Sequence, residues 1–486
     1  MAQNTKIAII GSFIWKFAER VLAQGISFVI SLVLARLLSP DDYGMIALVL
    51  VFINLAYVFI SSGFATALIQ NKDADSTDFS TNFYCSFVCA IVIYIGIFFA
   101  SPFVADFYEN QELVLVLRVF ALQIPLSAYN SIQNAYVARH MMFKKNFVST
   151  VISTIISGTI GIAMAVLGYG VWALVAQSIS NVIVSTIVLA IIVPWHAELK
   201  FSMQSAKNMM GYSSKLFAAD LSGTFFNEVR SLIIGKVYTS ADLAYYTKGQ
   251  QIPNLITQNL SNTVMAVLFP ALANESDDVT RVKNLTKRSL QLMSYIVFPA
   301  LFGLAAVMEP LVLLLYTEKW SQSIPFAQLL CIGSAVGLLG IFPLQTLKAI
   351  GRSDIVLGLE IWKKPMYVLL LVIGVKINVL AIAIMMVIYD IYAMIVNMQQ
   401  LKKPIHYGVG EQLIDIMPQL VLSAIMSFVV YIIPDIGGMV ITLIIKVLVG
   451  VIVYLAGSII MKNESFFIIK NLLLEKIPVK KKGENK

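Results

Sequence analysis

The chain has 486 residues, of which 58% are hydrophobic and 13% are charged. A soluble fold of this length cannot build a polar surface from such a composition, so water-soluble classes of protein are excluded. The formal net charge of +8 indicates membrane topology rather than a nucleic-acid partner, because lysines and arginines gather between long apolar stretches.

Fourteen apolar stretches follow one another along the chain. Each is long enough to cross the hydrocarbon core as a helix, which takes about 20 residues. Membrane β-strands are shorter and alternate in polarity, and lipid satisfies no backbone polar group, so we expect helices. The predicted spans are 11–35, 45–69, 82–105, 113–137, 147–167, 170–193, 211–235, 245–270, 289–308, 324–348, 355–374, 378–398, 416–433 and 438–461. The predicted fold class is an all-α polytopic membrane protein.

Positive charges occupy alternate loops, and this pattern predicts the orientation. One set of loops and the tail carry Lys72, Arg139, Lys144, Lys145, Lys200, Lys207, Arg281, Lys283, Lys287, Arg288, Lys348, Arg352, Lys402, Lys403, Lys462, Lys470, Lys476 and Lys480 to Lys482. The opposite loops carry mainly carboxylates, namely Asp41, Asp42, Asp106, Glu109, Glu112, Glu309, Glu318 and Asp435, with Lys319. Because positive loops face the cytoplasm, both termini are predicted to be cytoplasmic.

The two halves of the chain resemble each other. Residues 35–44 match 235–244, and farther along 170–175 match 378–383. Each pair lies in the corresponding loop or helix start, which argues against chance similarity among apolar helices. A parallel repeat is typical of transporters, which bind substrate between the lobes. The sequence therefore predicts two pseudo-symmetric six-helix lobes around a central cavity, 1–200 and 201–410, then two extra helices, 411–466, and a basic cytoplasmic tail, 467–486.

Two predicted helices carry polar stripes, because spacings of three and four residues place side chains on one face. The stripe of 113–137 consists of Gln123, Ser127, Asn130 and Asn134. The stripe of 245–270 consists of Thr247, Gln251, Asn254, Gln258 and Asn262, with Lys248 beside it. Such stripes can join helices by hydrogen bonds. Their length favours a water-filled cavity that binds a polar substrate.

Ionisable residues within predicted spans are a sharper signal, because lipid makes them costly unless they are paired or hydrated. The first span carries Lys16, Glu19 and Arg20, and the seventh carries Asp220, Glu228 and Arg230. The repeat places Arg20 opposite Asp220. One interpretation is a structural ion pair of Arg20 with Asp220, accompanied by Glu19 with Lys16. The other is a mixed-charge cavity in which Lys16, Arg20, Arg230 and Lys248 bind an anionic substrate and carboxylates carry coupling ions.

The carboxylates in that second interpretation are Asp220, Glu19, Glu228 and Asp390. By contrast, Glu360, Lys363 and Lys364 are expected to form a local pair or to extend toward the membrane surface. The sequence has no Gly-x-x-x-x-Gly-Lys-Ser/Thr loop, so ATP hydrolysis by this chain is not expected. Its three cysteines fall within spans and its three histidines in loops, which indicates neither a metal site nor a cofactor. We expect a protein that is not an enzyme.

Several motifs resemble bacterial polysaccharide-transport flippases, the lipopolysaccharide, O-antigen and exopolysaccharide translocases of the multidrug/oligosaccharidyl-lipid/polysaccharide exporter superfamily. These motifs are LARLLSPDDYG (34–44), SGF (62–64), ALIQ (67–70), FK (143–144), LGYGVWALV (167–175), LIIGK (232–236) and LFPAL (268–272). Most are loop and packing positions, so they indicate the family and not the substrate site.

The resemblance implies alternating access driven by an ion gradient or the membrane potential. It implies that an undecaprenyl-diphosphate-linked oligosaccharide moves from the cytoplasmic to the outer leaflet of the bacterial inner membrane. Membrane lipids and the polysaccharide polymerase or export machinery would be partners. The alternatives are a cation-coupled drug exporter of the same superfamily, and a membrane enzyme or scaffold of polysaccharide assembly. Drug cations prefer acidic pockets, so Lys16, Arg20 and Arg230 favour an anionic cargo.

Overall fold

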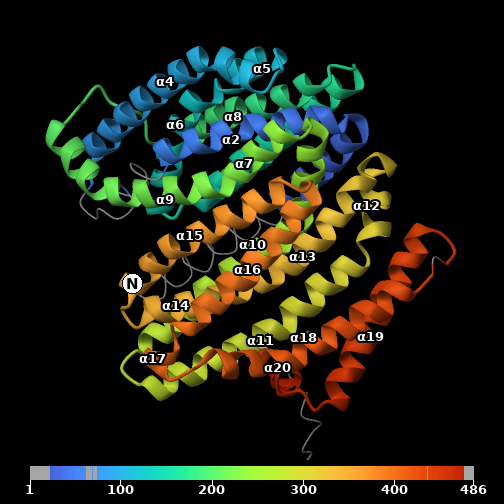
Figure 1. Ribbon diagram of the computed structural model, residues 1–486. Helices are drawn as coiled ribbons and strands as arrows, with labels where there is room; N and C mark the ends of the chain where they lie inside the picture. Colours follow the sequence, from blue (N-terminus) through green and yellow to red (C-terminus); the bar gives the residue numbers. More distant parts are fainter. Residues whose placement is uncertain (1–21, 62–67, 69–73, 435, 476–486) are drawn as a thin grey trace, which may run out of the picture. The chain divides into compact units, whose positions relative to one another are not determined.

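The computed structural model describes residues 22–61, 68, 74–434 and 436–475, and these form helices joined by short connections (Figure 1). No β-strand occurs among them. The chain divides into two compact units, Met1–Ala244 and Tyr245–Lys486. The predicted division into lobes, extra helices and tail stays a prediction.

The first unit begins with helix Leu22–Leu37. The helices that follow are α2 (Pro40–Ile60), α4 (Ser76–Phe107), α5 (Glu112–Phe120), α6 (Gln123–Arg139), α7 (Phe143–Val166), α8 (Val171–Ile192) and α9 (Met203–Val237). Helices α7 and α8 form a tight hairpin, and α9 packs against α2 and α4. The connection between α8 and α9 is held to α4, because the Glu198 backbone N–H donates to the Ser80 hydroxyl at 3.0 Å.

The second unit contains all but the first turn of α10 (Ser240–Asn274). It continues with α11 (Val279–Ala306), α12 (Met308–Tyr316), η2 (Glu318–Ser323), α13 (Ile324–Leu339), α14 (Ile341–Ala349), α15 (Ser353–Val375), α16 (Val379–Gln399), α17 (Lys402–Ile405), α18 (Val409–Ile432), α19 (Met439–Ile460) and α20 (Glu464–Glu475). Helix α11 packs against α13, α18 and α20. The residues 467–475 of the predicted tail are thus helical.

Ten helical segments of the described chain are long and apolar enough to cross a membrane. Of the other four predicted spans, 211–235, 245–270 and 355–374 lie within α9, α10 and α15, and part of 11–35 is helix Leu22–Leu37. Helices α9 and α15 carry several charged residues, which lowers their apolar character. The protein is a helical multi-pass membrane protein, and the count of fourteen spans stays a prediction.

Two predicted spans are broken in the structure. The span 113–137 consists of α5 and α6, and the span 324–348 consists of α13 and α14. The second helix of each pair has a proline at its third position, Pro125 or Pro343. Proline has no N–H to donate to the preceding turn, which explains why each helix is interrupted there. Both segments, Glu112–Arg139 and Glu318–Ala349, are still long and apolar enough to cross a membrane, each with an interruption in its helix.

The two halves repeat their helix ends. Ser39 and Asp42 form a reciprocal cap at the start of α2, in which the Asp42 N–H donates to the Ser39 hydroxyl at 3.2 Å. Thr239 and Asp242 form the same cap at α10, at 3.1 Å. Each cap satisfies N–H groups that a helix start leaves unpaired. The matching sequences 35–44 and 235–244 therefore build matching local structure.

Candidate functional site

A carboxylate and an amide meet between α2 and α9 in the first unit. The Asn54 amide donates a 2.9 Å hydrogen bond to Glu228 Oε1, and the contact is partly buried. Asn54 comes from an otherwise apolar helix, and Glu228 is one of the predicted coupling residues. A hydrogen bond to a carboxylate lowers the cost of holding it among apolar helices. Because Asn54 is neutral, this contact is a hydrogen bond and not an ion pair.

The polar side chains of the predicted stripe on α6 differ in their hydrogen bonding. The Ser127 hydroxyl donates to the Tyr57 hydroxyl of α2 at 3.2 Å, so it joins two helices. Among the described residues, Gln123 Nε2 and Asn130 Oδ1 are buried and have no hydrogen-bond partner. Asn134, one turn farther, is exposed. Buried amides usually find a protein, water or ligand partner, so Gln123 and Asn130 are suited to contact a polar guest.

A buried cation, Lys248, lies beside the predicted stripe of α10 in the second unit. Lys248 is only 6% exposed, and its ammonium donates to Gln251 Oε1 at 3.1 Å. The ammonium also lies 5.3 Å from the centre of the Tyr316 ring and 5.5 Å from that of Trp320. Aromatic faces attract cations at this range. Asn254 is half-buried and Gln258 is exposed on the following turns.

The aromatic residues around Lys248 are positioned by one turn. Tyr316 ends α12, and Thr317 has a φ of 76°, which directs the chain into η2 and Trp320. Non-glycine residues rarely adopt this left-handed conformation. Both Tyr316 and Trp320 are 1% exposed or less. The turn therefore builds a rigid wall beside the lysine.

The remaining predicted residues are not gathered into one described site. Lys16, Glu19 and Arg20 lie outside the described residues, and so does the Arg20–Asp220 pair. Asp220 is exposed and Arg230 is half-buried. Asp390 of α16 lies against α13, where a Cβ on Gly333 would come within 2.9 Å of its Oδ2.

The local pair predicted in α15 is confirmed. Lys363 Nζ lies 2.7 Å from Glu360 Oε1, and the ammonium also donates to Asn397 Oδ1 at 3.3 Å. Asn397 in turn donates to the Gly340 carbonyl at 3.0 Å. This chain of contacts joins α15 to α16 and to the break between α13 and α14. Lys363 therefore has a structural partner and is not a candidate for substrate binding.

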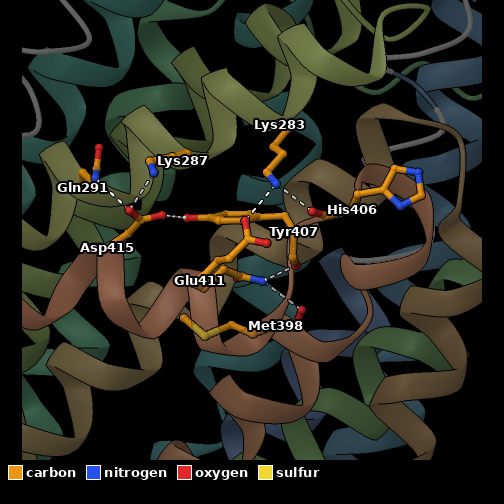
Figure 2. A network of polar contacts seen from close by, with 9 residues as sticks. Lys283, Lys287, Gln291, Met398, His406, Tyr407, Glu411 and Asp415 are labelled. Carbon is orange, nitrogen blue, oxygen red and sulfur yellow. Dashed lines mark hydrogen bonds and ion pairs between the residues drawn. The ribbon is translucent and has the colours of Figure 1, made fainter.

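A larger polar network joins α11 to the start of α18 (Figure 2). Asp415 Oδ1 lies 2.9 Å from Lys287 Nζ and accepts from the Gln291 amide at 3.1 Å. Its other oxygen accepts from the Tyr407 hydroxyl at 2.7 Å. Burial, followed by the bond to Asp415, raises the pKa of Tyr407 above its ordinary value. Asp415 is thus bonded on both oxygens and serves to hold the two helices together.

Lys283 extends this network toward the turn before α18. Its ammonium lies 2.8 Å from Glu411 Oε2 and donates to the His406 carbonyl at 2.7 Å (Figure 2). The fully buried Gln412 amide donates to the carbonyls of Met398 and Tyr407 at 3.0 and 2.8 Å. Sequence reasoning missed this network, although α18, like α6, carries a polar stripe with spacings of three and four residues. The stripe consists of Gln412, Asp415, Gln419 and Ser423, all buried.

Comparison with known proteins connects these features to one family. The profile of the family described as "Polysaccharide biosynthesis protein" matches residues 33–325. The succinoglycan biosynthesis transport protein ExoT of Rhizobium meliloti is 25% identical over 66% of this chain and 65% of its own length, which is just under two thirds. The lipopolysaccharide biosynthesis protein WzxC of Escherichia coli is 23% identical over 74% of each chain.

Solved structures share the fold. The lipid II flippase MurJ in an inward closed conformation superposes with a TM-score of 0.74 at 16% identity, over 92% of this chain and 98% of that chain. An inward-facing multidrug resistance transporter of the MATE family has a TM-score of 0.61 at 14% identity, over 78% of this chain and 94% of that chain. The fold is therefore that of these transporters.

Proposed function

This chain belongs to the polysaccharide biosynthesis protein family, and from that membership we propose that it is a flippase for a lipid-linked oligosaccharide. It moves an undecaprenyl-diphosphate-linked repeat unit from the cytoplasmic to the outer leaflet of the bacterial inner membrane by alternating access. The observation that carries the proposal is a family match over most of the chain, joined to a fold shared with MurJ. The protein acts as a transporter and not as an enzyme, and both termini face the cytoplasm.

Polar groups within the helices support a hydrated headgroup as cargo. The buried amides of Gln123 and Asn130 can bond sugar hydroxyls, which are both donors and acceptors. Arg230 and Lys248, with Lys16 and Arg20, supply positive charge for the diphosphate. Asn134, Gln251, Asn254 and Gln258 extend the same polar surfaces. A diphosphate-sugar cannot enter hydrocarbon unaided, so such groups replace its hydration shell.

An apolar groove supports a lipid tail on the same cargo. A groove of about 510 Å³ lies between α10, α11, α18 and α19. Its walls include Ile296, Pro299, Leu304, Met426, Val447 and Val451. Lys446, buried to 7% exposure, is the cation in this lining. A polyprenyl chain matches such a surface, whereas a small hydrophilic drug would leave it unused.

Glu228 is the carboxylate we favour for ion coupling. It lies between α2 and α9 with an amide partner, Asn54, at 2.9 Å. A carboxylate bonded to a neutral group changes its charge more readily than one held in an ion pair. Asp220, Glu19 and Asp390 remain the other coupling candidates. A cation-coupled drug exporter is the competing function, because the MATE transporter shares the fold.

Reconstitution tests the proposal directly. The purified chain is placed in vesicles that contain a fluorescent undecaprenyl-diphosphate oligosaccharide in one leaflet, and a membrane-impermeant quencher or glycosidase reports the leaflet. We expect movement of the lipid that accelerates when a proton or sodium gradient is imposed. Gradient-driven export of cationic dyes with no movement of the lipid would instead establish the drug exporter. Protein-free vesicles and vesicles with heat-denatured protein are the controls.

A further inference from the structure

A basic pocket lies at one end of the second unit, apart from the candidate site described above. It has a volume of about 880 Å³ and is formed by the turn before α15, the end of α16 and α17. Its lining includes Arg352, Lys402, Lys403 and His406, together with Gln399 and Gln400. The lining itself contains no carboxylate, and Arg352 is paired with Asp354 just outside it, so Lys402 and Lys403 make the pocket suited to an anion.

The cations of this pocket are presented by a fixed backbone. The buried Leu401, directly before α17, and Ile405, its last residue, anchor the short helix, while Lys402 and Lys403 are exposed. His406 then turns the chain with a φ of 52°, and its carbonyl accepts a 2.7 Å bond from Lys283. The two exposed lysines therefore directly precede a turn that Lys283 holds in place.

An apolar groove continues from the basic pocket between α15 and α16. It has a volume of about 540 Å³, and its lining shares Ile355, Gln399 and Gln400 with the pocket. The rest of the lining is Gly358, Leu359, Trp362, Ile395 and Val396. A Cβ on Gly358 would meet no atom within 4 Å, so there is open space beside this residue. Trp362 is 70% exposed beside it.

The basic pocket and the apolar groove together indicate which kind of ligand fits. Positive charge next to an apolar groove fits a molecule with an anionic head and a hydrocarbon chain. Free phosphate would use only the basic part. From Ile355 to Trp362 the groove covers about two turns of α15, roughly 10 Å by helical rise, which is shorter than one leaflet. Such a site holds the headgroup end of a lipid that stays in its leaflet.

We propose that the pocket and groove bind an anionic phospholipid of the leaflet at the lysine-rich end of the second unit. The headgroup phosphate contacts Lys402, Lys403 and Arg352, and one acyl chain lies over Gly358 between α15 and α16. Arg352 also bonds Asp354 through two contacts of 3.1 Å, which orients its guanidinium. The bound lipid fills the gap between the two helices and stabilises their packing.

Native mass spectrometry of the full chain tests this site. The protein in neutral detergent is titrated with phosphatidylglycerol, and separately with phosphatidylcholine that has the same acyl chains. We expect Lys402→Gln/Lys403→Gln to weaken phosphatidylglycerol binding roughly tenfold to thirtyfold, since each interfacial lysine contributes about 1 kcal/mol. Phosphatidylcholine binding should be weak and unchanged. The matched control, Lys462→Gln/Lys470→Gln, removes the same charge from exposed positions outside the pocket and should bind normally.

A second variant tests the apolar groove. Gly358→Phe fills the groove without a change of charge, and we expect it to weaken phosphatidylglycerol binding severalfold; if the lysine variant does not fold, this variant decides. Unchanged binding by either folded variant overturns the proposal. Displacement of phosphatidylglycerol by millimolar inorganic phosphate would show a site for free phosphate and overturn it too. Tighter binding of undecaprenyl phosphate at these residues would assign the site to the cargo lipid, which also contradicts our proposal.

Discussion

Tyr407 donates a 2.7 Å hydrogen bond to Asp415 Oδ2, and the tyrosine side chain is fully buried. The bond joins the turn after α17 to the second turn of α18. Asp415 is held from the other side by Lys287 at 2.9 Å. One carboxylate therefore fixes the start of α18 against α11, so the two helices should move together.

Removal of the Tyr407 hydroxyl should weaken this junction. Tyr407→Phe leaves Asp415 Oδ2 without its hydrogen-bond donor, and we expect the free energy of unfolding to fall by about 1.5–3 kcal/mol. The pKa of Tyr407 is raised in the folded state, so the stabilisation is complete below the ordinary tyrosine pKa of about 10 and is lost as pH rises above it. Thermal denaturation in detergent should give a melting temperature that is higher for the original protein than for Tyr407→Phe. This difference should be constant from pH 6 to about 9 and should shrink above pH 10. A difference that grows at high pH would contradict this.

Removal of the Asp415 charge should destabilise the protein more than removal of a charge from an exposed ion pair. Asp415→Asn removes the ion pair with Lys287, and we expect a loss of about 1–3 kcal/mol. The control is Glu109→Gln, which removes the 2.9 Å pair with Lys236 from a side chain that is 82% exposed; its effect on stability should be slight. Equal shifts in melting temperature for the two variants would show that the Asp415 network is no more important than a surface pair.

Replacement of Glu228 by glutamine separates coupling from structure. Glutamine can still accept the Asn54 hydrogen bond through its oxygen, so stability should change by less than about 1 kcal/mol. Gradient-driven movement of the lipid should fall at least tenfold if Glu228 carries the ion. Asn54→Ala, which keeps the carboxylate but removes its donor, is the comparison. Full gradient response by Glu228→Gln would move the coupling role to Asp220, Glu19 or Asp390.

Gly44 should tolerate no larger residue. A Cβ there would lie 1.8 Å from the Ser240 carbonyl oxygen, which belongs to the backbone. We expect Gly44→Ala to destabilise the protein by about 2–3 kcal/mol. In Gly96→Ala, by contrast, the new methyl meets nothing within 4 Å, and alanine in a helix should be neutral or stabilising by up to about 1 kcal/mol. Melting temperatures of the two variants measure the contrast.

The predicted orientation can be checked by labelling. In a variant whose three native cysteines are replaced by alanine, a membrane-impermeant maleimide added outside should modify cysteine at Asp106 and not at Lys402. Cells made permeable should show labelling at both positions, which serves as the control. The reverse pattern would overturn the orientation and place the basic pocket at the outer surface.

Apolar stretches predict most of the fold, because lipid leaves few alternatives to a helix. Hydropathy predicts the helices less well where charged residues or prolines lie within them. Charges in α9 and α15 reduce their apolar character, and prolines at Pro125 and Pro343 break two helices that hydropathy alone presents as continuous. The caps of Ser39 and Thr239 are local in sequence and could have indicated the starts of α2 and α10, which the predicted spans 45–69 and 245–270 place five residues too late.

The site was less predictable because its contacts join distant parts of the chain. The stripe on α6 was visible, but the pairing of Asn54 with Glu228 spans 174 residues and leaves no local pattern. The position of Tyr316 and Trp320 beside Lys248 depends on the turn at Thr317, and no spacing of residues in the sequence indicates that turn. In α18 the stripe of Gln412 and Asp415 could have been recognised, had the predicted span begun earlier than residue 416.

The junction of α11 with α18 also has a consequence for biosynthesis. Lys283 donates to a carbonyl that lies 123 residues later in the chain. A ribosome therefore delivers α11 to the membrane long before its anchors exist, and the lysines must stay in water until α18 arrives. A nascent chain that stops before α18 would lack Glu411 and Asp415, the carboxylates that pair with Lys283 and Lys287, so quality-control proteases should recognise it as incomplete.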